Sequence, residues 1–393
     1  DMAWFQGDAV RKNPNLKPET TISKEIGAEV RLLDGRLTAD VTYYDKYTRD
    51  QIVESELSYL SNYQRVIINS GKISNKGWEI SVSGVPVKVK NFEWKTIFNW
   101  SKNNSMVESL PEGIDKIQIG SGVYNVKSYA EVGKPYGAIY AKTFKRDAEG
   151  YILCQLDGSP KEGQDYEYLG CVQADWRGGW NNVFRLGNFS FSVMFDFQKG
   201  GKFFSQTSIQ SSVDGQSVKS LEGRDADFFS RKILGESDEE RYGFMRPQNA
   251  NTPTANGQIY PDWGRPKGVV LPNCRYDEDV EGLAGQQVLG YCTPERYWMH
   301  YTSRDISRFI YDASYVKLRE ITVSYDLPKK WLRKTPFQTF RVAAVGRNIA
   351  TLFANTPHGL DPQATSTTGN AQGFERGFNL PSATYGFDIK VSF

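Results

Sequence analysis

The chain has 393 residues, and its 48 Lys and Arg residues nearly balance its 46 Asp and Glu residues, for a formal net charge of +2. No basic run is long enough to follow a phosphate backbone, so nucleic acid is not an expected partner. No apolar stretch reaches the ~20 residues that a membrane-spanning helix needs. The mean hydropathy of −0.54 is that of a water-soluble protein. A barrel strand shows only alternate side chains to lipid, however, so hydropathy leaves a membrane β-barrel open.

The first residues, Asp1–Trp4, have neither the basic stretch nor the apolar core of a signal peptide. We therefore expect the chain to begin within a longer protein.

Strict alternation of apolar and polar residues predicts strands with one apolar and one polar face along most of the chain. In chain order, the clearest segments are Ile22–Leu32, Leu37–Tyr43, Phe92–Trp100, Phe189–Phe197, Ile321–Leu327 and Ser382–Phe393. A soluble β-sandwich alternates in the same way, so this pattern alone does not choose between the two folds.

The connections between the predicted strands distinguish the two folds. Tight turns are predicted at Asp34-Gly35 and at Leu186–Asn188, with short links near 86–91 and 328–336. Long polar stretches alternate with them, the longest from about 205 to 308. Short turns at one end and long loops at the other are typical of an outer-membrane barrel. We therefore predict an all-β chain with about nine membrane-spanning antiparallel strands, short periplasmic turns and long extracellular loops.

Several short segments, in this order and spacing, resemble the carboxy-terminal part of SusC-like TonB-dependent outer-membrane transporters. They are Asn13–Glu19, Ile73–Glu79, Tyr168–Gly170, Asp175–Gly179, Gln198–Gly201, Asp312–Arg319, Tyr325–Pro328, Gly346–Asn348 and Gly359–Pro362. The resemblance covers nearly the whole chain. It implies that residues 1–393 are the carboxy-terminal portion of a barrel of roughly 22 strands, whose plug domain and TonB-contacting segment lie outside this chain.

The same resemblance implies active import of a nutrient, with energy supplied through the TonB complex and no cofactor. The implied partners are a SusD-like surface lipoprotein, outer-membrane lipid and the upstream half of the same barrel. A glycan or oligosaccharide is the favoured cargo. A peptide importer, a metal-chelate importer and a passive pore stay open as alternatives. The bare Gly120-Ser121-Gly122 is no phosphate-binding loop.

Catalysis and metal binding find little support in the sequence. The chain has two histidines, His300 and His358, and neither lies in a recognisable motif. The remaining enzymatic alternative is a barrel hydrolase that uses one of these histidines beside a serine. The acidic run Asp277–Glu281 lacks the spacing of an EF-hand, so we expect a solvated loop rather than a Ca²⁺ site. We therefore expect no enzyme and no metal site.

Aromatic residues are concentrated in the longest predicted loop. They are Tyr260, Trp263, Tyr276, Tyr291, Tyr297 and Trp298. Trp and Tyr can stack on sugar rings or grip apolar groups, so these residues are candidates for contact with a ligand or a partner. The alternative is that they anchor the loops against one another.

The four cysteines fall into two pairs that are close in sequence, both in predicted extracellular loops. Because that compartment is oxidising, we expect one disulfide between Cys154 and Cys171 and another between Cys274 and Cys292. Unpaired or differently paired thiols are the alternative.

The last strand carries a predicted assembly signal on its apolar face. Its residues are Tyr385, Phe387, Ile389, Val391 and Phe393. The terminal Phe393 resembles the final aromatic residue that the barrel-assembly machinery recognises. We expect removal of Phe393 to lower the amount of assembled barrel, measured by surface labelling, more than it lowers the heat resistance of barrels that do assemble. Normal surface levels of the truncated protein would contradict this expectation.

Finally, we expect that the chain does not close a barrel by itself. An isolated arc of strands would leave two edges with unpaired backbone groups in lipid, each costing several kcal/mol. The segment Ile22–Leu32 and the segment Tyr385–Phe393 should therefore pair with strands of the upstream half, not with each other.

Overall fold

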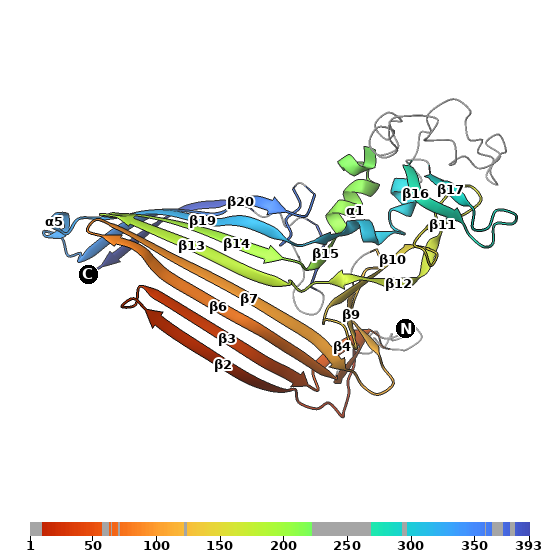
Figure 1. The fold of residues 1–393 in the computed structure, drawn as a ribbon, viewed down its shortest axis with the longest axis horizontal. Coiled ribbons are helices and arrows are strands. Elements are labelled where there is room, and N and C mark those ends of the chain that lie inside the picture. The colour runs from red at the N-terminus through yellow and green to blue at the C-terminus, as the bar shows by residue number, and fades with distance from the viewer. Residues whose placement is uncertain are drawn as a thin grey trace, which may run out of the picture.

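One curved antiparallel sheet of nine strands dominates the structure, a computed structural model (Figure 1). The structure describes residues 10–56, 63, 65–69, 71–121, 124–221, 269–292, 297–357, 359–363, 372–377 and 382–393. In their order across the sheet, the strands are β2 (Thr20–Leu32), β3 (Leu37–Arg49), β6 (Lys72–Val89), β7 (Phe92–Ser109), β13 (Trp176–Leu186), β14 (Phe189–Lys199), β19 (Tyr315–Asp326), β20 (Thr339–Ala354) and β22 (Thr384–Ser392). The predicted all-β fold and the predicted nine strands are confirmed for the described residues.

Tight connections join the strands at one end of the sheet, which we call the hairpin end. Gly187 and Asn188 alone separate β13 from β14, and Gly187 adopts a φ of 56° that glycine tolerates without strain. The predicted link near 328–336 contains a short helix, α5 (Lys329–Leu332). Pro86, by contrast, lies inside β6, where the register shifts between Gly84 and Val87. A proline has no backbone N–H for the ladder, and a bulge is where a strand accommodates it.

The strand register sorts the side chains onto two faces of different chemistry. One continuous row across five strands runs Val30, Ala39, Val82, Phe98 and Trp180, each directly opposite the next. The next row, one residue along each strand, runs Glu29, Asp40, Ser81, Asn99 and Gly179. Side chains of adjacent residues in a strand point to opposite faces. The sheet therefore has an apolar face and a polar face.

The apolar face is exposed rather than covered by a second layer. Ile26 is 73% exposed and Phe387 is 86% exposed. Large apolar patches open to solvent are rare in soluble proteins and mark a surface that meets lipid or another protein. None of the described helices is long and apolar enough to span a bilayer.

The first and last strands of the sheet are its two edges. β2 pairs with β3 alone, and β22 pairs with β20 alone. The predicted absence of pairing between them is confirmed for the described residues. Their pairing with an upstream part of the barrel remains a prediction.

Four smaller sheets lie at the opposite end, which we call the loop end (Figure 1). They are β1 (Val10–Arg11) with β5 (Arg65–Asn69) and β4 (Ile52–Glu56); β12 (Glu162–Cys171) with β10 (Ala138–Phe144), β9 (Lys127–Glu131) and β8 (Lys116–Ser121); β11 (Ile152–Cys154) with β16 (Val269–Tyr276) and β17 (Gln287–Cys292); and β18 (Ile310–Asp312) with β15 (Lys202–Ser205) and β21 (Phe374–Glu375). Short helical segments accompany them: α1 (Gln206–Val213), η1 (Val218–Leu221), η2 (Tyr297–Tyr301) and η3 (Ile306–Phe309).

The loop end has an apolar core of its own, unlike the exposed sheet. The largest buried cluster includes Phe144, Leu271, Tyr276, Tyr297 and Trp298, which come from segments more than a hundred residues apart. A second cluster holds β15, α1, η3 and β21 together, through residues such as Phe204, Ile209, Phe309 and Phe374. Burial of this apolar surface gives the described loop residues a defined structure.

Asp277 ties the β16 to β17 connection to the neighbouring loop. Its carboxylate accepts hydrogen bonds from Lys145 Nζ at 2.9 Å and from the N–H of Glu278, and it forms an ion pair with Lys161 at 2.8 Å. Two carboxylates of the acidic run, Asp277 and Asp279, are therefore paired with lysines, and the described residues contain no cluster of potential metal ligands. Burial alone raises the pKa of Asp277, but these hydrogen bonds outweigh it and lower the pKa to about 2.

This lowered pKa predicts a pH-dependent attachment of the β16–β17 hairpin. A carboxylate whose folded-state pKa is depressed stabilises the fold above its unfolded pKa of about 4, and that stabilisation is lost as pH falls toward 2. Pepsin should therefore cleave residues 269–292 faster at pH 2 than at pH 4, after correction with an unstructured substrate. The Asp277→Asn variant should lack this difference in cleavage rate between pH 2 and pH 4. If cleavage of the variant rises as much between pH 4 and pH 2, groups other than Asp277 cause the pH dependence.

Candidate functional site

Charged side chains gather on the polar face where β14 and β19 approach the loop end. Asp196 of β14 lies directly opposite Lys317 of β19. Arg319 Nε donates a hydrogen bond to Asp196 Oδ2 at 3.2 Å, and Arg319 Nη2 forms an ion pair with the same oxygen. Tyr315 OH donates to this oxygen as well, at 3.2 Å. We call Asp196, Tyr315, Lys317 and Arg319, together with Asp361 and Gln363, the polar cluster.

A β-bulge creates this arrangement. Lys317 is opposite Asp196 and Leu318 is opposite Phe195, but the next pair is Glu320 with Met194, so Arg319 is an extra residue in β19. The extra residue reverses the alternation. Before it the odd-numbered residues are polar, and after it they are apolar, as at Ile321. Bulges commonly re-aim side chains in this way near functional sites.

The segment that follows β20 folds back onto the polar cluster. Lys317 Nζ binds both carboxylate oxygens of Asp361, at 2.5 and 2.6 Å, and Gln363 Oε1 at 3.0 Å. Lys317 is 2% exposed and Asp361 is 8% exposed, so this is a buried ion pair. Arg319 adds a hydrogen bond to Asn348 Oδ1 at 2.9 Å. Asn348 has a φ of 55°, a conformation that asparagine tolerates better than most residues.

Three cavities open along the polar face beside this cluster. Their volumes are about 390, 380 and 250 Å³. Arg177 lines all three, and Asp196 lines the two larger ones. The first cavity lies under the folded-back segment, and its lining residues are Val172, Arg177, Asp196, Gln198, Lys202, Phe203, Ala313, Tyr315, Pro362, Gln363, Gln372 and Gly373.

Arg177 is the cation that the three cavities share. It is exposed, and Nε donates a hydrogen bond to Gln198 Oε1 at 3.1 Å. Among the residues that the structure describes, no carboxylate forms an ion pair with it. A guanidinium presents up to five donors in a planar fork, which suits carboxylates and other groups rich in oxygen acceptors. The cavities thus combine Arg177 with amide and hydroxyl groups, and the 380 Å³ cavity adds the carboxylates of Asp40, Glu79 and Asp196.

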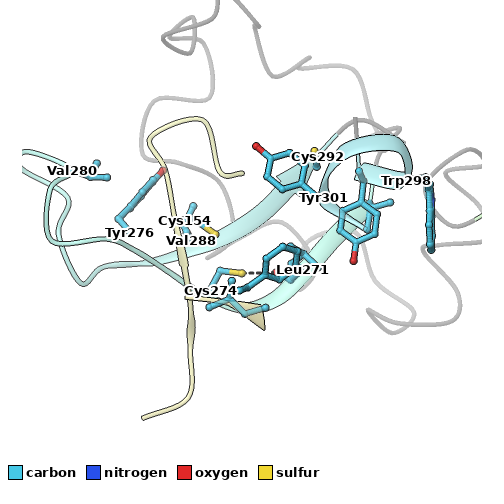
Figure 2. Close-up of a cluster of buried hydrophobic side chains, with 13 residues drawn as sticks. Cys154, Leu271, Cys274, Tyr276, Val280, Val288, Cys292, Trp298 and Tyr301 are labelled. Carbon is cyan, nitrogen blue, oxygen red and sulfur yellow. Dashed lines mark hydrogen bonds between the residues drawn. The ribbon is translucent and has the colours of Figure 1, made fainter. Parts of the chain in front are cut away.

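The aromatic residues predicted to contact a ligand lie mostly elsewhere. Tyr276, Tyr297 and Trp298 are 1–3% exposed inside the loop-end core, as Figure 2 shows for Tyr276 and Trp298. The predicted contact role is therefore wrong for these three in this conformation, because they anchor loops against one another. Tyr260, Trp263 and the side chain of Tyr291 lie outside the described residues. His300 is exposed in η2, and His358 is outside the described residues.

The predicted disulfide pairing also disagrees with the structure. Cys154 is buried in the same apolar cluster as Cys274, whereas the Cys171 sulfur contacts the carbonyl of Tyr136 at 3.5 Å. The second predicted pair is too far apart, since Cys292 lies opposite Val269, five residues from Cys274. That separation is about 15 Å along a strand, whereas a disulfide needs Cα atoms within about 7 Å. Sequence proximity was misleading because β11 pairs with β16, from more than a hundred residues later.

Comparison with known proteins agrees with the nine-stranded sheet and its two faces. A family model described as TonB dependent receptor-like, beta-barrel matches residues 3–349. TonB-dependent receptor P3 of Formosa agariphila is 25% identical over 395 residues, which cover 95% of this chain and 33% of that protein. TonB-dependent receptor SusC of Bacteroides thetaiotaomicron is 29% identical over 104 residues, which cover 26% of this chain and 10% of SusC.

Solved structures show the same fold. The structure of the RagAB peptide transporter superposes with a TM-score of 0.59 and 17% identity, over 97% of this chain and 36% of that one. Its closed-closed state, described as that of a peptide importer, gives a TM-score of 0.60. The chain spans about a third of the length of TonB-dependent receptor P3.

The fold and its faces define the wall of an outer-membrane β-barrel. The chain belongs to the TonB-dependent receptor β-barrel family. Members of this family are transporters and receptors of the outer membrane. The apolar face therefore faces lipid, the polar face lines the barrel interior, and the loop end is extracellular.

Proposed function

We propose that this chain is the carboxy-terminal portion of the barrel wall in a TonB-dependent nutrient importer, and that cargo binds in the cavities beside Arg177. The observation that supports this most is the position of Arg177. It lines all three cavities, lies on the interior face and has no carboxylate partner among the described residues. A plug domain and a TonB-contacting segment would belong to the rest of the protein.

The cargo that we favour is a glycan or oligosaccharide. A sugar offers many hydroxyl groups, and an acidic sugar adds a carboxylate for Arg177. The amides of Gln198, Gln363 and Gln372 can donate to hydroxyls and accept from them, which suits a sugar ring. Sequence similarity to SusC supports the same choice.

A peptide is the second candidate. The fold is shared with the RagAB peptide transporter, and a peptide has a terminal carboxylate that a guanidinium binds well. A metal chelate and a passive pore are weaker alternatives.

We further propose that a SusD-like surface lipoprotein covers the loop end. The folded loop sheets offer a structured extracellular surface on which such a partner can dock. TonB would supply the energy through a segment outside this chain, and we expect neither a cofactor nor catalysis.

Growth of a strain that lacks this gene, on purified polysaccharides and on peptides, tests the proposal. We expect loss of growth on one class of nutrient, restored by the wild-type gene. The Arg177→Gln variant should raise the half-saturating nutrient concentration by about tenfold or more, because a charge-assisted hydrogen bond contributes about 1.5–3 kcal/mol.

Arg185→Gln is the matched control, because Arg185 is on the same strand and face but lies near the hairpin end and lines none of the three cavities. Normal growth of the deletion strain on every nutrient would argue against import. Equal effects of Arg177→Gln and Arg185→Gln would contradict binding of the nutrient in the cavities.

A further inference from the structure

Two cysteines from distant parts of the chain meet in the loop-end core. Cys154 ends β11, and Cys274 lies in β16, the strand that pairs with it in parallel. Ile152 is opposite Cys274 and Cys154 is opposite Tyr276, so both cysteines lie on the same face of this small sheet. Both cysteines belong to the same buried apolar cluster, and Figure 2 shows their side chains on adjoining strands.

The surroundings of this pair are closed. Cys154 is 0% exposed and Cys274 is 2% exposed. Gly290 leaves room for the Cys274 sulfur, because a Cβ at that position would lie 2.5 Å from it. Cys274 Sγ also donates to the carbonyl of Leu271 at 3.2 Å. The neighbouring Cys274 thiol and burial both raise the pKa of Cys154, so this thiol is unreactive once the core has formed.

We propose that Cys154 and Cys274 form a disulfide during assembly, and that it fastens the loop after β10 to the β16–β17 hairpin. The reaction takes place in the periplasm, where protein disulfides act as oxidants. One cysteine thiolate attacks the oxidant disulfide to form a mixed disulfide, and one oxidant sulfur leaves as a thiolate. The second cysteine thiolate then attacks the first cysteine's sulfur and displaces the other oxidant thiolate.

Atoms and electrons balance in this oxidation. Two cysteine thiols are oxidised to one disulfide, the oxidant is reduced from a disulfide to a dithiol, and the two protons pass to its sulfurs. The bond would close a loop of about 120 residues, from Cys154 to Cys274. Long closed loops are those for which a cross-link restricts the unfolded chain most.

Trypsin makes the test direct, because its cleavage sites place the four cysteines in four different peptides. These peptides span residues 147–161, 162–177, 268–275 and 276–296. The full-length protein is purified from outer membranes, treated with iodoacetamide in denaturant without reductant, digested and analysed by mass spectrometry. We expect the peptide 147–161 joined to the peptide 268–275, and separation of the two after reduction. Alkylation of both Cys154 and Cys274, or a bond from either one to a different cysteine, would overturn the proposal.

Two variants sharpen the result. Cys154→Ser should leave Cys274 open to alkylation, whereas Cys171→Ser should leave the linked pair of peptides intact. If the Cys154→Ser protein fails to accumulate, the wild-type and Cys171→Ser digests still decide the question. Loss of the link in the Cys171→Ser protein would also overturn the proposal.

Discussion

Replacing Lys317 with Met is expected to detach residues 359–363 from the interior face of the barrel. The substitution leaves the Asp361 carboxylate buried without its cation, and removal of one partner from a buried ion pair costs about 3–5 kcal/mol. Gln363 would lose its bond to Lys317 at the same time. Hydrogen exchange of the backbone amides in this segment measures the effect, and we expect a rise of at least about a hundredfold.

Two controls separate loss of charge balance from loss of packing. The double variant Lys317→Met with Asp361→Leu should recover most of the protection, because it leaves no buried charge without a partner. Arg341→Met removes a cation from an ion pair at the hairpin end whose side chains are about 40% exposed, and should cost less than about 1 kcal/mol. If the amides of residues 359–363 exchanged no faster in Lys317→Met than in Arg341→Met, the buried ion pair would not hold residues 359–363 in place.

Replacing Phe98 with Arg should destabilise the barrel by about 2–4 kcal/mol. Phe98 lies in the apolar row between Val82 and Trp180. It is six residues from the start of β7, which places it about 15 Å above the hairpin end for a strand tilted by about 40°. A charge at that depth faces the middle of the hydrocarbon layer. The amount of heat-resistant barrel in outer membranes, seen as a fast-migrating band on an unheated gel, should fall severalfold.

Asn99→Arg is the matched control for this substitution. Asn99 is the next residue along β7, but its side chain lies on the polar face and lines one of the cavities. The same Arg should therefore change the amount of heat-resistant barrel little. Similar losses in the two variants would mean that the apolar face does not contact lipid.

The strands were predictable because their chemistry repeats with a period of two. Each alternating segment was found close to its true position, and the last strand, predicted from Ser382, begins at Thr384. The turn residues also predicted which strand ends are joined by tight hairpins, as at Gly187. Local pattern is sufficient here because one face meets lipid and the other meets water, so each strand carries its own signal.

The interior site was not predictable in this way. Lys317 and Asp361 were both in segments that resemble the family, yet nothing in either segment indicates that they pair. The change of phase after Arg319 was visible in the sequence as a switch of polar residues from odd to even positions, and it was the one local signal of the bulge. Arg177 gave no signal of its own, because an arginine in a barrel strand is common on the water-facing side.

The loop end was the hardest part to predict. Its core forms between segments far apart in sequence, as the contact between Cys154 and Cys274 illustrates. Pairings of this kind depend on tertiary structure, so proximity in sequence led to the wrong cysteine partners. The same principle explains why Tyr297 and Trp298, which resemble exposed binding residues in sequence, are buried.

The central claim is that this sheet separates lipid from a water-filled interior, and cysteine scanning across two adjacent rows tests it most directly. One row is Glu29, Asp40, Ser81 and Asn99, and the other is Val30, Ala39, Val82 and Phe98. Each residue is replaced singly by Cys in the full-length protein in membranes, with the parent protein labelled in parallel. We predict that the first row reacts with a water-soluble maleimide, while a fluorophore on the second row is quenched by brominated lipid. Equal labelling and equal quenching of the two rows would contradict the account.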